Sequence, residues 1–237
     1  MALYRVPAVL VALVFHEFAH GLAAFWCGDS TARERGRLTL NPLPHLDVFG
    51  TLMLLVAGFG WAKPVPVNPT NFRHRRLDDF LVSIAGITMN LLIFSLSTVV
   101  LIIVDKDLWT PMTKLLYPIE QRMSFSGALG FVMYGEIAGL KQYGIGIADM
   151  SLVPVARFAG FMGMLNISIA VFNLIPIPPL DGSHVLADAV GKPELFYNKY
   201  ASGIGIVLLL LMTQTNWLGR AISFVADNLQ ALFFRFA

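Results

Sequence analysis

The hydrophobic positions of this chain gather into long runs that short polar stretches separate. Three runs, at residues 3–26, 80–104 and 155–175, are long enough to cross a hydrocarbon core of about 30 Å as helices. Two weaker apolar runs follow at residues 200–212 and 217–236, and charged side chains interrupt the second of them. The pattern predicts an all-α polytopic membrane protein, a bundle of about five or six transmembrane helices.

A half-length apolar segment, residues 48–61, follows the first run. Basic stretches lie on both sides of it, at residues 33–37 and 73–76, and the prolines within residues 63–69 prevent a helix from continuing. We expect this segment to enter the membrane and return to the same side, as a re-entrant or β-like insertion after the first helix. The excess of positive charge favours the cytoplasm for that side.

The middle of the chain leaves two interpretations open. Residues 125–147 are glycine-rich and carry two charged side chains, a pattern that fits either a weak span or an interfacial helix. We predict one membrane-embedded domain over residues 1–237, with a core of residues 1–104 and 155–237 and a variable insertion at residues 105–150.

The composition agrees with the membrane assignment. Hydrophobic residues make up 56% of the 237 positions and charged residues 14%, whereas soluble domains have about 25% charged residues. The net charge of +2 is too small to indicate a nucleic-acid partner. Cys27 is the single cysteine, which excludes an internal disulfide. The first apolar run is too long for a signal peptide and ends without an A-x-A site, so we expect it to be retained.

Two histidines and a carboxylate interrupt the first apolar run as His16-Glu17-Phe18-Ala19-His20. Ionisable groups inside a span are energetically unfavourable and are most often functional. His16 and His20 lie one turn apart on the same helix face, so both imidazoles can reach one metal ion. Glu17 lies one residue along and can approach the open side of that ion. Because neutral imidazole suits zinc, the sequence predicts a zinc site within the membrane.

A third protein ligand is needed, because two histidines alone bind zinc weakly. Asp181 is the best candidate, since it follows three prolines that break the run at residues 155–175. The two charges of Zn²⁺ would balance those of Asp181 and Glu17, which lowers the free energy of burying the cluster. Two alternatives stay open: Asp181 caps a helix that begins near His184, or His184 itself is the third ligand.

Four segments match the motifs of one protein family in the family's order. They are His16–His20 for H-E-x-x-H, residues 60–68 for G-W-A-K-P-V-P-V-N, residues 85–90 for A-G-P-x-x-N and residues 173–182 for N-x-x-P-x-P-x-L-D-G. On these segments the chain resembles the site-2 protease family of intramembrane zinc metalloproteases. Ile87 stands where proline is usual, which leaves the local helix shape open.

The resemblance implies an intramembrane zinc endopeptidase, with zinc held by His16, His20 and Asp181 and with Glu17 as the catalytic acid/base. It implies membrane protein substrates, cleaved in or near their transmembrane segments within the lipid bilayer, as in regulated intramembrane proteolysis. The chain resembles the compact bacterial and archaeal members without a PDZ or CBS domain. We therefore expect a multi-pass protein of a prokaryotic cell membrane whose active site faces the cytoplasmic side.

Two asparagines allow both a functional and a structural interpretation. The resemblance places Asn90 and Asn173 near the active site, where their amides can bind the substrate backbone or support the oxyanion. Buried asparagines in membrane helices also serve as hydrogen-bonding contacts between helices.

Two other functions are compatible with a metal site in a membrane. A metal transporter or metallochaperone would bind the ion without hydrolysis, but its ligands would be spread along a path and Glu17 would not be needed. A catalytically silent relative would only bind membrane helices, and it would not need the intact set of His16, Glu17, His20 and Asp181.

Overall fold

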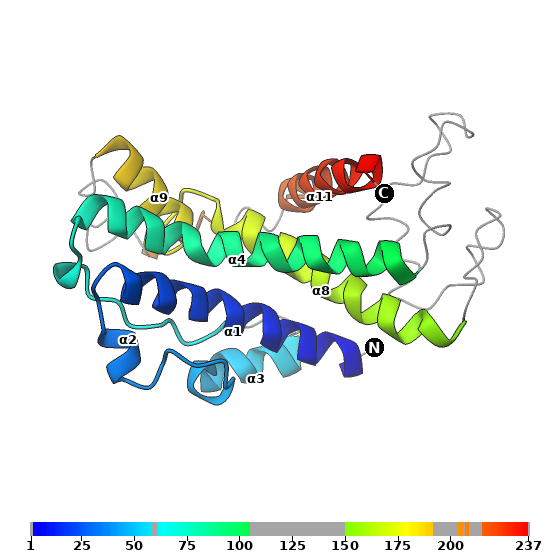
Figure 1. The fold of residues 1–237 in the computed structure, drawn as a ribbon, viewed down its shortest axis with the longest axis horizontal. Coiled ribbons are helices and arrows are strands. Elements are labelled where there is room, and N and C mark those ends of the chain that lie inside the picture. The colour runs from blue at the N-terminus through cyan, green and yellow to red at the C-terminus, as the bar shows by residue number, and fades with distance from the viewer. Residues whose placement is uncertain are drawn as a thin grey trace. The chain divides into compact units, whose positions relative to one another are not determined.

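The computed structural model describes residues 2–57, 61–104, 150–191, 203–205, 207–208 and 215–236 (Figure 1). Within these ranges the regular structure is helical, and one isolated antiparallel bridge joins Leu46 and Ala62. The predicted all-α class is therefore confirmed. Almost all of the predicted insertion at residues 105–150 and most of the run at residues 200–212 lie outside the described residues.

Three of the described helices are long and apolar enough to cross a membrane: α1 (Ala2–Trp26), α4 (Arg75–Val104) and α8 (Val153–Asn173). They correspond to the three long apolar runs of the sequence. α4 begins at Arg75 rather than at residue 80, because the Asp78 carboxylate accepts a hydrogen bond of 2.7 Å from the backbone N–H of His74 and thereby caps a polar first turn. The total number of spans stays a prediction.

The remaining helices are shorter or more polar. They are α2 (Thr31–Glu34), α3 (Val48–Ala57), α9 (Asp181–Val190), α11 (Trp217–Phe236) and the 3₁₀ helices η1 (Leu43–His45), η2 (Pro69–Asn71) and η4 (Met150–Leu152). α11 buries Ala226 and Gln230 on one face and exposes Phe224 and Leu232 on the other. The run at residues 217–236 is thus helical, but among the described helices it is not one of those apolar enough for a span.

The contacts divide the chain into two compact units. One comprises Met1–Val9, Leu92–Ser168 and Gly219–Ala237, and the other comprises Leu10–Leu91 and Ile169–Leu218. The first unit buries Phe94, Leu101 and Ile167 completely or almost completely. Every motif segment of the sequence lies within the second unit, so the site is built there.

The half-length apolar segment contains the helix α3, which has ten residues and is about 15 Å long. The chain before α3 pairs with the chain after it, since Leu46 and Ala62 form the antiparallel bridge and Lys63 N–H donates a hydrogen bond of 2.8 Å to the His45 carbonyl. The segment therefore leaves and returns at one place, as an insertion into a membrane from one side would. Its depth in a membrane stays a prediction.

Asp29 ties the end of α1 to the segment that follows the insertion. Its carboxylate is fully buried and accepts hydrogen bonds from Asn68 N–H at 2.7 Å, from Asn71 Nδ2 at 2.8 Å and from Thr31 N–H at 3.1 Å. Burial on its own would raise the pKa of Asp29, but these hydrogen bonds hold the pKa below its usual value. Residues 61–68 are thereby held against α1.

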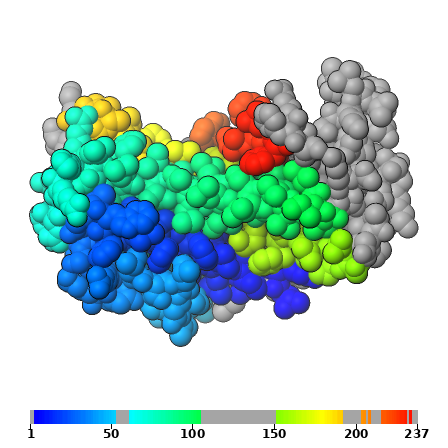
Figure 2. Space-filling view, in the orientation of Figure 1, coloured from blue at the N-terminus to red at the C-terminus, as the bar shows by residue number. Residues whose placement is uncertain are grey.

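α9 begins directly after the proline-rich stretch that ends α8. A Cβ atom on Gly182 would lie 2.4 Å from the carbonyl oxygen of Leu174, so glycine is required where the start of α9 touches the end of α8. The helix ends at Gly191, whose φ of 73° is left-handed and typical of a helix C-terminus. On the surface, α9 (gold) lies beside the first turns of α4 (cyan to green), as Figure 2 shows.

Candidate metal centre

The two histidines of the H-E-x-x-H motif face each other on α1. His16 is 5% exposed and His20 is 9% exposed, and their Nε2 atoms are 3.1 Å apart. The helical spacing of four residues produces this geometry, because side chains at i and i+4 lie on the same helix face.

Asp181, the first residue of α9, completes a group of three. Its Oδ2 atom lies 3.3 Å from Nε2 of His16 and 3.3 Å from Nε2 of His20. Among the His, Cys, Asp and Glu residues that the structure describes, these three form the group whose ligand atoms all lie within 4.8 Å of one another.

The hydrogen bonds behind the imidazoles fix which nitrogen faces the group. His20 Nδ1 lies 2.7 Å from the carbonyl oxygen of Val82, which can only accept, so Nδ1 carries the proton. His16 Nδ1 donates to Asn90 Oδ1 at 2.6 Å, while Asn90 Nδ2 donates to the Ala12 carbonyl at 3.4 Å. Both Nε2 atoms therefore present a lone pair to one point.

This arrangement fits a tetrahedral metal ion. Ligand atoms about 2.0–2.2 Å from a tetrahedral zinc are about 3.3–3.6 Å from each other, and the three separations here are 3.1, 3.3 and 3.3 Å. Asp181 Oδ2 is buried and makes no hydrogen bond to any described residue. Two imidazole lone pairs and a carboxylate oxygen converge here, and no proton donor lies between them. A divalent cation satisfies all three, and a donor set of two imidazoles and one carboxylate suits zinc.

α4 approaches the imidazoles closely at Gly86. A Cβ atom at this position would lie 2.4 Å from Nε2 of His20 and 2.6 Å from Cε1 of His16, well inside van der Waals contact. Glycine at residue 86 therefore allows the backbone of α4 to form one wall of the centre.

Glu17 lies next to the pair on α1, and the segment after the insertion holds its carboxylate. Oε2 of Glu17 accepts a hydrogen bond of 2.8 Å from the backbone N–H of Val65. Arg37 fixes the same segment, because its Nη2 donates to the carbonyl oxygens of Lys63 at 2.6 Å and Pro64 at 3.2 Å. Glu17 is not one of the three clustered donors, and a carboxylate that directly follows a metal ligand on the same helix is a candidate to accept and return a proton.

The other residues that the sequence singled out lie around the centre in different ways. Asn90 is fully buried behind His16, where it orients the imidazole rather than facing the open side. Asn173 is the half-buried last residue of α8. His184 faces α4, with Nδ1 4.0 Å from Asp79 Oδ2, and is not in the group of three.

Sequence reasoning missed the backbone carbonyl of Val82 and the role of Asp29. A backbone carbonyl leaves no signal in a sequence, because every residue has one. Asp29 has a weak signal, since it directly follows the glycine that ends the first span and is the residue type that accepts hydrogen bonds from turns. The close approach at Gly86 could have been suspected from a glycine inside a long apolar helix.

Comparisons with known proteins identify a protein family for the chain. The family model described as Peptidase family M50 matches residues 4–212. YwhC of Bacillus subtilis (strain 168), named as a zinc metalloprotease, is 35% identical over 212 residues, which cover 90% of this chain and 80% of the relative.

Two mycobacterial relatives are more distant. Rip2 of Mycolicibacterium smegmatis, also named as a zinc metalloprotease, is 28% identical over 178 residues, covering 73% of this chain and 52% of the relative. Rip2 of Mycobacterium tuberculosis (strain Erdman) is 28% identical over 218 residues, covering 88% of this chain and 67% of the relative. No solved structure matches the chain significantly.

Proposed function

The chain belongs to peptidase family M50, the zinc-dependent metalloproteases of the site-2 protease type, and from this premise we propose that it hydrolyses peptide bonds in or near the transmembrane segments of membrane proteins. The observation that carries the proposal is the convergence of two Nε2 atoms and one carboxylate oxygen at separations of 3.1–3.3 Å. We assign the metal-ligand role to His16, His20 and Asp181. When bound, zinc supplies a Lewis acid that polarises the peptide carbonyl and acidifies water.

Glu17 is the proton carrier in this proposal. One of its oxygens, Oε2, is held by the Val65 N–H, so the carboxylate keeps one orientation and Oε1 is the atom that takes a proton from the attacking water. Oε1 then delivers this proton to the departing amide nitrogen, which leaves as an amine. The hydrogen bond from Val65 keeps Glu17 beside the histidine pair during both transfers.

The substrate must present an unwound backbone, because the peptide bonds of a membrane helix are already hydrogen-bonded and shielded. Residues 61–68 contain no helix and donate a hydrogen bond from Val65 to Glu17, and they are candidates to accept the substrate as an added β-strand. Asn173 stays our candidate for substrate or oxyanion support. We assign Asn90 to positioning His16, because of its hydrogen bond to Nδ1.

Orientation follows from the positions of the basic residues. The stretches at residues 33–37 and 73–76 follow the end of α1 and precede most of α4, so both lie on one side of a membrane that these helices cross. We propose that this side is the cytoplasm of a prokaryotic cell. The partners are the transmembrane segments of substrates and the lipid bilayer.

The test compares the wild-type protein with Glu17→Gln and His16→Ala. The expected result is that Glu17→Gln retains zinc while uncleaved membrane proteins accumulate in the membrane proteome of cells that express it. His16→Ala should lose both zinc and cleavage. Cleavage by Glu17→Gln at the wild-type rate would contradict the assigned role, and a wild-type protein without zinc would contradict the centre itself.

A further inference from the structure

One face of α4 contacts both imidazoles of the centre. Val82, Gly86 and Asn90 lie four residues apart on this face. The Val82 carbonyl accepts a hydrogen bond from His20, and the Asn90 amide oxygen accepts one from His16. Gly86 leaves room for both imidazole rings. The third donor, Asp181, comes from a different helix, so something must set α9 against α4. We propose that Arg76, on the first turn of α4, is the positioning residue that does so; this inference rests on the metal-ligand role proposed for Asp181.

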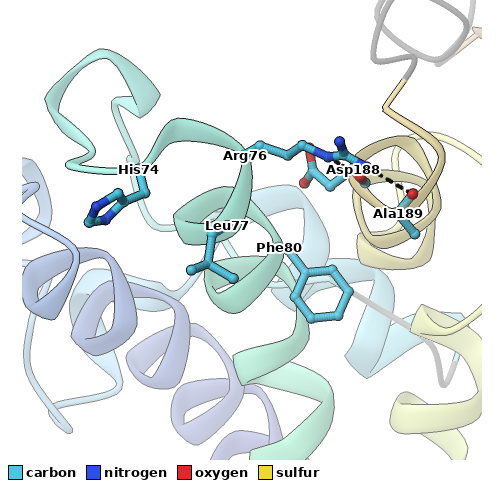
Figure 3. Close-up of a pocket in the computed structure, with 6 residues that line it drawn as sticks. All are labelled: His74, Arg76, Leu77, Phe80, Asp188 and Ala189. Atoms are coloured by element: carbon cyan, nitrogen blue, oxygen red, sulfur yellow. Dashed lines mark hydrogen bonds between the residues drawn. The ribbon is translucent and has the colours of Figure 1, made fainter.

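Arg76 bridges the two helices through hydrogen bonds to the end of α9. Its Nε donates to the Asp188 carbonyl, and its Nη2 donates to the Ala189 carbonyl at 2.9 Å (Figure 3). Carbonyls in the last turn of a helix lack intrahelical partners and carry the negative end of the helix dipole, so a guanidinium is well suited to bind two of them. The left-handed turn at Gly191 brings the backbone close, since a Cβ there would lie 3.2 Å from Arg76 Cζ.

Side-chain packing is incomplete at this end of α9. A hollow of about 520 Å³ is lined by Leu77 and Phe80 of α4 together with Arg76, His74, Asp188 and Ala189. Figure 3 shows Arg76 reaching across to α9 while Phe80 extends from the next turn of α4. His184 of α9 also faces Asp79 of α4, but its Nδ1 lies 4.0 Å from Asp79 Oδ2, which is too long for a hydrogen bond. The guanidinium bridge therefore supplies two short hydrogen bonds between the helices at this place.

The bridge acts on the centre through the helix. α9 is a single rigid element that carries Asp181 as its first residue and the bridged carbonyls in its last turn. Its start contacts the end of α8 at Gly182, so release of the other end lets α9 tilt about that contact. The Asp181 carboxylate then moves with the helix. Because metal–ligand distances tolerate changes of only about 0.2 Å, this movement weakens the contact of Asp181 with the metal. Loss of Arg76 should therefore weaken zinc binding without removing a ligand.

The experiment measures zinc affinity by competition with a chelator and records the absorption spectrum of the Co²⁺-substituted protein. Arg76→Gln should weaken zinc binding about 10-fold, as partners of metal ligands typically do, and should change the Co²⁺ spectrum. Arg76→Lys should give an intermediate affinity, because an ammonium is a point donor that cannot hold two carbonyls as a planar guanidinium does. The neighbouring exposed Arg75 provides the control Arg75→Gln, which should match the wild type.

A second control separates positioning from general stability. Phe80→Ala enlarges the same hollow without touching the bridge, so it should lower the unfolding temperature while zinc affinity stays near that of the wild type. Equal losses of affinity in Phe80→Ala and Arg76→Gln would overturn the inference, as would a wild-type affinity and Co²⁺ spectrum in both Arg76 variants. Asp181→Ala serves as the reference: if it binds zinc as tightly as the wild type, the proposed function fails, and if it binds weakly while Arg76→Gln does not, only the role of Arg76 fails.

Discussion

The backbone of α4 at Gly86 touches the imidazole of His20 so closely that a Cβ atom there would lie 2.4 Å from Nε2. This nitrogen is one of the three donor atoms of the centre. Any side chain at residue 86 would occupy the space in which the donors converge, so the contact makes one α4 position part of the metal centre without supplying a ligand.

Gly86→Ala should therefore weaken zinc binding by about 10-fold or more, because the new methyl group displaces both imidazoles from their positions. Zinc content after dialysis against a chelator measures the effect. Gly163→Ala on α8 is the matched control, since its Cβ would make an ordinary contact of 3.5 Å with Ser97 Cβ. That control should keep its zinc and gain about 0.5–1 kcal/mol of stability from the higher helix propensity of alanine. Full zinc retention in Gly86→Ala would show that the helices separate easily here.

Asn90→Ala should lower zinc affinity about 10–100-fold, because His16 loses the acceptor that fixes its Nδ1 proton and its ring orientation. Asn90→Asp keeps an acceptor at the same place and should recover part of the affinity. Isothermal titration with zinc measures both variants.

Asn166→Ala is the control for the removal of a buried asparagine from a membrane helix, since Asn166 is fully buried and donates to the Met162 carbonyl within α8. It should lower the unfolding temperature and leave zinc affinity unchanged. If Asn166→Ala and Asn90→Ala lose affinity to the same extent, Asn90 acts through stability and not through His16.

The sequence was sufficient to predict the three long apolar helices, because each is an apolar run without a cluster of charges, and Pro7 lies near enough to the start of α1 for the helix to continue through it. It also identified the three residues that the structure brings together, since the spacing of His16 and His20 reports a helix face directly. Asp181 was found from its position after the prolines and from the family motif, not from any local periodicity. The family resemblance and the zinc cofactor are confirmed, while the roles of the individual residues stay predictions.

Other features depend on tertiary contacts that a sequence does not encode locally. The bridge from Arg76 joins residues 112 and 113 positions apart, and nothing around Arg76 distinguishes it from its basic neighbours. The family resemblance suggested a substrate-binding amide at Asn90, and this role stays a prediction, but no local sequence signal indicated the hydrogen bond between Asn90 and His16. The start of α4 was placed too late because the polar stretch before residue 80 looked like a loop, although Asp78 and His74 cap it as helix.

Asp188→Asn should change how stability depends on pH. Burial, and then the nearby carboxylate of Asp79, raise the pKa of Asp188 to about 6, and interactions with His184 and Arg76 offset only part of this effect. The folded state therefore binds a proton that the unfolded state has released, so Asp188 lowers the free energy of unfolding as pH rises from about 4 to 6. Asp188→Asn should unfold at a higher temperature than the wild type at pH 7.5, and the difference should shrink towards pH 4.5. A difference that does not vary across this range would contradict the raised pKa.

Asp29→Asn should separate catalysis from metal binding. Asp29 lies outside the centre, but its carboxylate holds Asn68, and residues 61–68 place the Val65 N–H on Glu17. The substituted amide would turn an NH₂ group towards backbone donors, which should destabilise the protein by about 1–3 kcal/mol and loosen the segment. Zinc affinity should stay within about twofold of the wild type, because none of the three donor atoms depends on this segment, while the cleavage rate at saturating zinc should fall about 10-fold or more.

The control for Asp29→Asn is Glu34→Gln, which changes an exposed carboxylate of α2 close in sequence and should leave both zinc affinity and cleavage rate unchanged. Parallel losses of zinc and cleavage in Asp29→Asn would mean that the segment supports the whole centre and not Glu17 in particular.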